Sequence, residues 1–149
     1  MNQLFYAPHI ENNLAQLDVE ESRHLLTVLR RQVGDRLQLT DGKGFFYEAE
    51  ITEAGKKQAL VRILKTDPGP APTARLHIAI APTKQIDRFE WFLEKATEIG
   101  IQEITPLRCK RSERTNIRQD RLEKILVSAM KQSMQSRLPT LHPLTTFSE

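Results

Sequence analysis

Residues 76–107, LHIAIAPTKQIDRFEWFLEKATEIGIQEITPL, decide the fold of the second half of the chain. The stretch opens on the nearly continuous apolar run 76–81, which is typical of a parallel strand covered on both faces. An amphipathic helix follows, and its expected buried stripe consists of Phe89, Phe92, Leu93, Ala96 and Ile99. Gly100 is placed to end this helix, and residues 101–107 supply a second strand. Because strand, helix and strand in close succession form a βαβ crossover, the stretch predicts a parallel α/β sheet.

A second amphipathic helix is expected downstream, beginning near Asn116 and ending at 137–139, Arg-Leu-Pro. Its buried stripe is expected to consist of Leu122, Ile125, Leu126, Ala129 and Met130. Residues 87–90 predict a capping box for the first helix, and residues 146–149, Thr-Phe-Ser-Glu, repeat that pattern with no helix after it. We therefore expect a truncated second domain; the alternative is a small complete α+β domain with a frayed tail.

The proline-rich segment 68–72 separates this part of the chain from the first half, because proline fixes φ and removes a backbone donor. We predict a domain boundary here, with one domain at residues 1–70 and a second at residues 73–149. The charges differ across the boundary. Residues 1–72 carry 9 basic and 10 acidic side chains, whereas residues 73–149 carry 13 basic and 9 acidic ones.

The first half predicts a small antiparallel β-barrel with one helix. Residues 18–21 form a capping box, after which Leu25, Val28 and Leu29 are expected to be buried and Gly34 to mark the end of the helix. Alternating strands are predicted at 36–40, 45–51 and 59–64, joined by glycine-containing turns. Such a barrel serves either to bind a ligand or as a scaffold.

The composition excludes several classes of protein. At 39% hydrophobic and 28% charged residues, with a net charge of +3, the chain is expected to be soluble and globular. A single cysteine, Cys109, allows neither an intrachain disulfide nor a cysteine-based zinc site, which favours a reducing, cytoplasmic setting. The four histidines show no metal-ligand spacing, so no metal is expected. No apolar run approaches the roughly 20 residues of a membrane span, and no signal peptide is recognisable.

Basic residues are concentrated in residues 108–137, which carry 9 basic and 3 acidic side chains. Arg114, Arg118 and Arg121 are predicted to share one face of the second helix, where they would meet the phosphates of an RNA. The alternative is a solvated helix face. A looser basic group, Arg23, His24, Arg30, Arg31 and Arg36, surrounds the helix of the first half. The aromatic residues 45–47 are possible stacking surfaces, although most of them are expected in the core.

Two loops follow the carboxyl ends of the predicted parallel strands, the edge at which open α/β sheets bind ligands. Lys84 lies in the first loop and Arg111 in the second. A loop lysine is also commonly just solvated. The sequence contains neither of the common glycine-rich phosphate-binding motifs and no spacing that suggests a catalytic triad.

Several short motifs in order resemble the 16S ribosomal RNA uridine-N3 methyltransferase family. They are HLLTVLR at 24–30, Gly34, Asp41-Gly42, AEI at 49–51, Lys84, KATEIG at 95–100, ITP at 104–106, Arg111-Ser112, Gln132 and Leu138-Pro139. The resemblance implies a PUA-like barrel that helps to hold RNA, followed by a SPOUT-class α/β domain with a trefoil knot that dimerises and binds S-adenosylmethionine. It also implies that Arg111 is an active-site or phosphate-binding residue, that Lys84 is an active-site candidate, and that Arg23, Arg30, Arg31 and Arg36 contact RNA.

The resemblance also implies that part of the enzyme is absent. The family's glycine-rich turn and its Leu-Gly-x-x-x-Leu-Arg segment, which form the knot and most of the cofactor pocket, have no counterpart before Glu149. We therefore expect S-adenosylmethionine to serve the complete, homodimeric enzyme, and this chain alone to be inactive and to bind no cofactor tightly.

The chain departs from the family at Lys131, where many members carry Glu, and at Met134-Gln135, where many carry Gly-Arg. The expected partner is 16S ribosomal RNA or the small ribosomal subunit, not a membrane. The alternatives are a non-catalytic RNA-binding module, and a structural protein that does not bind RNA at low salt.

Overall fold

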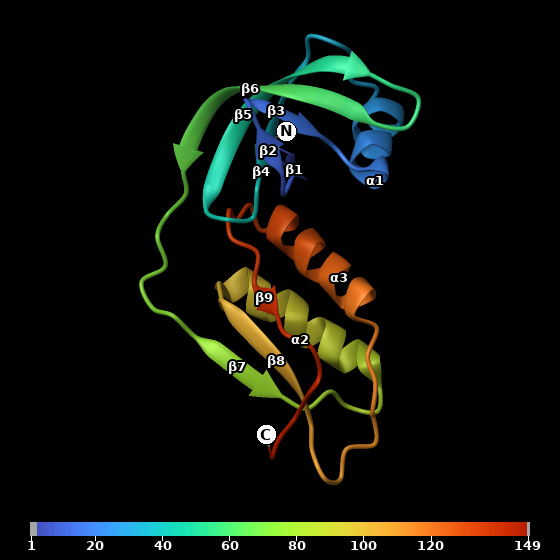
Figure 1. Cartoon of the computed structure of the whole chain (residues 1–149), viewed down its shortest axis with the longest axis vertical. Helices are drawn as coiled ribbons and strands as arrows, with labels where there is room; N and C mark the ends of the chain where they lie inside the picture. The colour runs from blue at the N-terminus through green and yellow to red at the C-terminus, as the bar shows by residue number, and fades with distance from the viewer. Residues whose placement is uncertain (1–2, 149) are drawn as a thin grey trace. The chain divides into compact units, whose positions relative to one another are not determined.

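The computed structural model describes residues 3–148, and the chain divides into two units. The first unit contains Met1–Ala71 together with Met134–Arg137, and the second contains Pro72–Ser133 together with Leu138–Glu149. Strands dominate the first unit, whereas two long helices pack beside parallel strands in the second (Figure 1). Each unit is therefore built from two separate stretches of sequence.

The first unit is a curled six-stranded sheet with the strand order β1-β4-β5-β6-β3-β2. Its strands are β1 (Leu4–Tyr6), β2 (Ile10–Glu11), β3 (Leu14–Gln16), β4 (Arg36–Thr40), β5 (Phe45–Ala54) and β6 (Ala59–Pro68). Neighbouring strands pair antiparallel, except for β1 and β4, which are parallel. The predicted small β-barrel is confirmed, with one parallel pair that the sequence pattern did not indicate.

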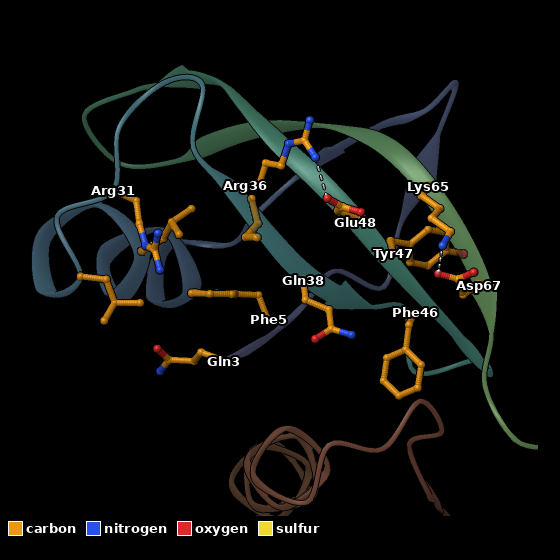
Figure 2. Close-up of a pocket in the computed structure, with 13 residues that line it drawn as sticks. Gln3, Phe5, Arg31, Arg36, Gln38, Phe46, Tyr47, Glu48, Lys65 and Asp67 are labelled. Carbon is orange, nitrogen blue, oxygen red and sulfur yellow. Dashed lines mark hydrogen bonds and ion pairs between the residues drawn. The ribbon is translucent and has the colours of Figure 1, made fainter. Parts of the chain in front are cut away.

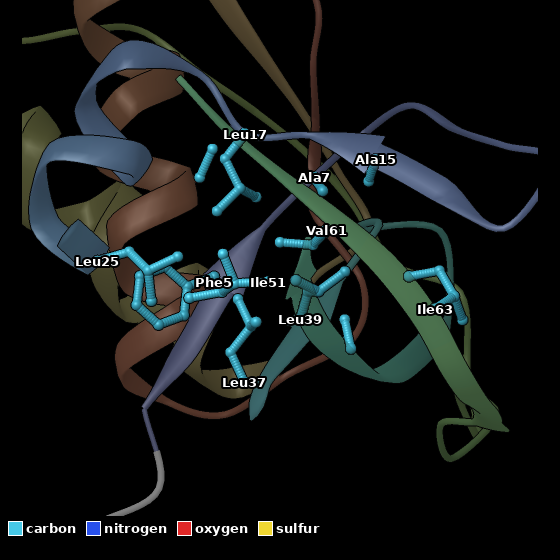
Figure 3. Close-up of a cluster of buried hydrophobic side chains, with 12 residues drawn as sticks. Phe5, Ala7, Ala15, Leu17, Leu25, Leu37, Leu39, Ile51, Val61 and Ile63 are labelled. Carbon is cyan, nitrogen blue, oxygen red and sulfur yellow. The ribbon is translucent and has the colours of Figure 1, made fainter. Parts of the chain in front are cut away.

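One face of this sheet carries the core of the first unit, because side chains alternate between the two faces along each strand. Leu39, Ile51 and Val61 of the central strands are completely or almost completely buried, and Leu17 and Leu25 join the same cluster (Figure 3). Burying a leucine or valine side chain contributes about 1.5–3 kcal/mol, so this cluster holds the helical segment against the sheet.

The helix of the first unit begins where the sequence predicted. α1 (Val19–Arg23) has Asp18 as its N-cap, and the Asp18 carboxylate accepts the Glu21 N–H at 2.7 Å. It continues as a π-helical turn, η1 (His24–Val28). The wider π turn is the feature that the sequence pattern did not indicate.

The π turn explains two wrong predictions. Because a π turn holds more residues than an α turn, side chains three residues apart within it no longer share one face. Leu25 is buried as predicted, but Val28 of the same turn is 56% exposed instead of packing in the core. The helical segment also ends before Gly34, because Arg30 already adopts a left-handed conformation with φ 54°.

The second unit is a parallel sheet with helices packed on one face. Its strands are β7 (His77–Ile80), β8 (Glu103–Arg108), β9 (Thr140–Leu141) and β10 (Thr145–Thr146), and its helices are α2 (Ile86–Ile99) and α3 (Gln119–Gln132). β8 pairs in parallel with β7, β9 and β10. α2 connects β7 to β8, so the predicted βαβ unit and parallel sheet are confirmed.

α2 confirms one predicted boundary and contradicts the other. Gly100 caps the carboxyl end with φ 100°, a left-handed conformation that glycine adopts without strain. At the amino end the N-cap is Gln85, so Asp87 lies inside the first turn and the predicted capping box is wrong. Ile99 is 78% exposed, because it is the last helical residue before the chain turns away at Gly100.

β7 is not covered on both faces as the sequence predicted. His77 and Ala79 are exposed, whereas Ile78 and Ile80 are partly buried against the core of the second unit. Both helices contribute to that core, so the face that carries Ile78 and Ile80 is the face they cover.

α3 is shorter than the predicted helix at both ends. It begins at Gln119 instead of near Asn116, and it ends at Gln132 instead of at 137–139. Two residues later, Met134 turns the chain away with a left-handed φ of 56°. Residues 134–137 then belong to the first unit, where the Ser136 carbonyl accepts the Gly44 N–H at 2.8 Å. The sequence pattern did not indicate this return of the chain.

The predicted helix start at residues 146–149 is only partly described. Thr146 ends β10, and the Phe147 N–H donates to the Arg108 carbonyl at 3.1 Å within a turn. Glu149, the acidic residue of the predicted capping pattern, lies outside the described residues.

Candidate functional site

Three arginines beside the helical segment of the first unit are free of internal partners. Arg23, Arg30 and Arg31 are exposed, and within residues 3–148 their side chains make no hydrogen bond or ion pair. Arg36 differs, because its Nη1 contacts Glu48 Oε1 at 3.0 Å. A guanidinium without an internal partner can bind a phosphate without first breaking an ion pair. The first three arginines are therefore better suited than Arg36 to the predicted RNA contacts.

A cleft of about 340 Å³ is lined in part by Arg31 and Arg36 (Figure 2). It combines apolar, amide, aromatic and charged side chains, among them Leu25, Gln38, Phe46, Arg31 and Lys65. Of the aromatic residues that the sequence offered as stacking surfaces, Phe46 and Tyr47 line this cleft, whereas Phe45 does not. Sequence spacing could not find it, because its lining comes from strands and a helix that only the fold brings together.

Asp41 organises the turn beside this cleft. Its carboxylate accepts the Lys43 N–H at 2.8 Å and the Tyr47 hydroxyl at 2.9 Å. Burial of the phenol, together with the Asp41 carboxylate, raises the pKa of Tyr47 to about 12. The hydroxyl of Tyr47 is therefore a protonated donor committed to Asp41 at neutral pH.

In the second unit, the loops after β7 and β8 are joined to one another. The Arg114 guanidinium donates to the carbonyls of Thr83 and Lys84 at 3.2 and 2.7 Å. Lys84 Nζ also lies 3.8 Å from Glu113 Oε2. The two predicted catalytic residues, Lys84 and Arg111, are thus on loops that are hydrogen-bonded together at one sheet edge. The Arg111 side chain is exposed and has no partner within residues 3–148.

The predicted face of three arginines on the second helix is wrong. Arg114 and Arg118 precede α3, and Arg121 alone of the three lies within it. Arg118 Nη2 lies 3.5 Å from Asp120 Oδ2, and Arg121 Nε lies 3.0 Å from Glu90 Oε1. The hydrogen bond to Glu90 also raises the pKa of Arg121 above its ordinary value. All three therefore have internal partners, and their contact with RNA stays a prediction.

The structure brings together two histidines that are far apart in the sequence. The rings of His77 and His142 lie 5.2 Å apart, and His142 Nε2 is 3.1 Å from Glu103 Oε1. Arg75 Nη2 contacts the other oxygen of Glu103 at 3.2 Å. The hydrogen bond from His142, followed by the charge of Arg75, holds the pKa of Glu103 below its ordinary value. No sequence motif indicates this cluster, because its members come from separate strands and loops.

Among residues 3–148 no group of three His, Cys, Asp or Glu side chains could hold a metal ion. No helix in the same range is long and apolar enough to cross a membrane.

The first unit is thus a curled sheet with three unpaired arginines, and the second is a parallel α/β unit whose loops at one sheet edge carry basic side chains. Residues 17–64 match the RNA methyltransferase PUA domain, and residues 70–149 match the RNA methyltransferase domain. The chain belongs to this RNA methyltransferase family. The resemblance seen in the sequence is thereby confirmed.

Individual relatives agree with this assignment. Over 140 residues the chain is 29% identical to the ribosomal RNA small subunit methyltransferase E of Rickettsia conorii. The match covers 93% of this chain and 57% of that protein. The crystal structure of a probable rRNA-methyltransferase from Porphyromonas gingivalis is 44% identical, with a TM-score of 0.89 over 98% of this chain and 61% of that one.

A third relative was solved with a ligand. The ribosomal RNA small subunit methyltransferase E from Neisseria gonorrhoeae, bound to S-adenosyl methionine, is 27% identical with a TM-score of 0.84, over 98% of this chain and 62% of that one. These likenesses confirm the predicted fold class, a PUA-like barrel together with a parallel α/β unit of the SPOUT class. The chain spans little more than half the length of the curated relatives it matches.

Proposed function

We propose that this chain is the RNA-holding part of a methyltransferase that transfers a methyl group from S-adenosylmethionine to N3 of a uridine in 16S ribosomal RNA. The observation that carries the proposal is the ordered match of a PUA domain and a methyltransferase domain along one chain. Relatives named ribosomal RNA small subunit methyltransferase support the choice of RNA. In this proposal the whole enzyme is a cytoplasmic homodimer that acts on 16S ribosomal RNA or the small ribosomal subunit.

Methyl transfer to uridine N3 is favoured by cationic groups near the base. The N3 position of a neutral uridine must lose its proton to accept a methyl group, so negative charge develops on the imide. In our proposal Arg111 stabilises this charge or holds a neighbouring phosphate, and Lys84 is a weaker second candidate. Two observations support these roles. Arg111 and Lys84 lie on adjoining loops at the edge of the sheet where ligands commonly bind, and the Arg111 side chain has no internal partner within residues 3–148.

One groove of the second unit was a candidate for the methyl donor, and its lining does not fit that group. This groove of about 510 Å³ lies between α2 and α3 and is lined mainly by charged and polar side chains such as Glu90, Arg121 and Lys124. An adenosine group needs apolar or aromatic walls, and Ile125 and Ala129 are the apolar side chains here. We infer that cofactor binding needs the part of the relatives that this chain does not match. The 149-residue chain then neither binds S-adenosylmethionine tightly nor methylates RNA alone.

Methyl transfer to small ribosomal subunits tests the proposal. Small subunits from cells that lack the corresponding methyltransferase are incubated with tritiated S-adenosylmethionine and one of two proteins. One is this chain, and the other, the longer product, is this chain joined to the C-terminal part of a full-length relative. We expect both proteins to bind 16S ribosomal RNA at low salt, but only the longer product to transfer label, recovered as 3-methyluridine by mass spectrometry. Methylation of another atom or another RNA would overturn the assignment. RNA binding without transfer by the longer product would favour a non-catalytic RNA-binding module.

Arg111→Ala in the longer product tests the role of this residue. Loss of a group that stabilises the developing anion should lower the rate of methyl transfer by about 10²–10³-fold. Lys110→Ala, a change to the exposed neighbour in the same turn, should leave the rate within about threefold of wild type. An unchanged rate for Arg111→Ala would contradict the catalytic role.

A further inference from the structure

The cleft of the first unit is the right size for one nucleotide. Its volume of about 340 Å³ lies within the range of small-molecule sites, roughly 300–1,000 Å³. It lies beside the start of β4, where β1 pairs only with residues 38–40 and leaves Arg36 and Leu37 at an open edge. All the residues that line it belong to the first unit. A double helix is too wide for this space, whereas an unstacked nucleotide fits.

The walls offer the two groups that recognise a nucleobase. Gln38 and Phe46 project to the same side of the sheet (Figure 2), as expected from the antiparallel register in which Thr40 faces Phe46 and Gln38 faces Glu48. The amide of Gln38 has no hydrogen bond within residues 3–148, so both its donor and its acceptor are available to a base edge. The ring of Phe46 provides a face on which a base can stack.

The cleft also borders the apolar core of the first unit. Phe5, Leu25 and Leu37 are at its margin, but they are buried on the face of the sheet opposite to Gln38 and Phe46. The remaining amide and phenol are already committed, since Gln3 contacts His24 and the Tyr47 hydroxyl donates to Asp41. Among the side-chain amides and the phenol that line the cleft, Gln38 is therefore the one that is available to hydrogen-bond the edge of a base.

The charges at the rim favour an anion. Arg36 is paired with Glu48 at 3.0 Å and Lys65 with Asp67 at 3.6 Å, as the dashed lines in Figure 2 mark. Arg31 is the lining cation that has no partner within residues 3–148. The rim thus carries one positive charge in excess of its internal pairs, and a phosphodiester carries one negative charge.

We propose that this cleft binds a single unstacked nucleotide of an RNA strand. The base stacks on Phe46, Gln38 hydrogen-bonds its edge, and the phosphate pairs with Arg31. The inference rests on the proposed function, because it takes RNA as the substrate. It gives the barrel a definite role, which is to capture a looped-out nucleotide and not the surface of a duplex.

Two neighbouring phenylalanines of β5 provide the test. Binding of fluorescein-labelled oligouridine is measured by fluorescence anisotropy for the chain and for Phe46→Ala, Phe46→Tyr and Phe45→Ala. Phe45 is the matched control, because it is 41% exposed on the same strand but does not line the cleft. Phe46→Ala should weaken binding by about fivefold or more, whereas Phe46→Tyr, which keeps the ring, and Phe45→Ala should bind within about twofold of wild type. Thermal unfolding confirms that each variant is folded.

The possible results distinguish a failure of the proposed nucleotide subsite from a failure of the proposed function. Equal losses in Phe45→Ala and Phe46→Ala, or stronger binding of an RNA duplex than of the single strand, would overturn the subsite and leave the proposed function standing. Competition by free uridine monophosphate as strong as that by the strand would overturn the assignment to RNA. Failure of the unaltered chain to bind any RNA at low salt would overturn both proposals.

Discussion

Glu103 shows how one side chain can organise a surface that no sequence motif marks. It lies on β8 and joins His142 and Arg75, which precede or follow neighbouring strands of the same sheet. His77 lies beside this group, with its Nε2 2.7 Å from Thr105 Oγ1. The register of the parallel strands brings these residues together, because His77 is paired with Glu103 and Glu103 with Thr140.

The lowered pKa of Glu103 predicts a pH-dependent contribution to stability. Because the pKa is lower in the folded chain than its ordinary value of 4.5, the carboxylate stabilises the fold above that value and loses this effect as pH falls. Glu103→Gln should therefore lower the melting temperature at pH 7, and the difference from wild type should shrink as the pH falls below 4.5 and vanish below the lowered pKa of the folded chain. Differential scanning fluorimetry across this range measures it. Glu123→Gln, at an exposed site on α3, is the control; a difference for Glu103→Gln that persisted at low pH would contradict the charge-based cause.

At the scale of elements, periodic patterns predicted the strands and the buried helix faces better than the helix ends. The strand at 36–40 and the buried positions Leu93, Ala96 and Leu126 follow from alternation and helical spacing, which local chain geometry dictates. The ends depend on backbone conformations that only tertiary contacts select. The π turn after α1 and the late start of α3 are of this kind.

Met134 is an element boundary with a strained backbone. It adopts φ 56° at a position where the family resemblance suggests glycine, and it is 37% exposed. Met134→Gly should stabilise the chain by about 0.5–1 kcal/mol, because relief of a left-handed conformation worth roughly 1–2 kcal/mol exceeds the roughly 0.4–1 kcal/mol entropic cost of glycine. Urea unfolding measures this difference.

Met134→Ala is the matched control for this change. It removes the side chain but keeps the Cβ and its left-handed strain, so it should give no gain in stability. A similar gain for Ala and Gly would show that the side chain, and not the backbone, is responsible.

At the scale of the whole molecule, the sequence indicated where charge is concentrated but not which charges are available. Residues 73–149 hold the excess of basic side chains, yet Arg114, Arg118 and Arg121 are engaged with internal partners. The first half is close to neutral, but Arg23 and Arg30 have no partner within residues 3–148. Pairing depends on which carboxylates and carbonyls the fold brings near, and sequence separation does not reveal it.

This distribution predicts the salt dependence of RNA binding. Each contact with a phosphate of single-stranded RNA contributes about 0.7 to the slope of log affinity against log salt concentration. Replacing Arg23, Arg30 and Arg31 together by Gln should therefore reduce the slope by about 2. Filter binding between low and moderate salt measures it. Arg62→Gln serves as control, because Arg62 is already paired with Glu50 at 3.1 Å; an equal loss of slope for both proteins would contradict the role of unpaired arginines.

The return of residues 134–137 to the first unit means that residues 1–71 alone do not contain the whole of that unit. A coding segment that stops at Ala71 carries every strand of the sheet but leaves behind the Ser136 carbonyl that accepts the Gly44 N–H. Gly69 adds to the dependence, since a Cβ at that position would collide with the Ser136 side chain. A barrel that is cut off at Ala71 therefore loses a backbone partner of Gly44 and the side chain against which Gly69 packs.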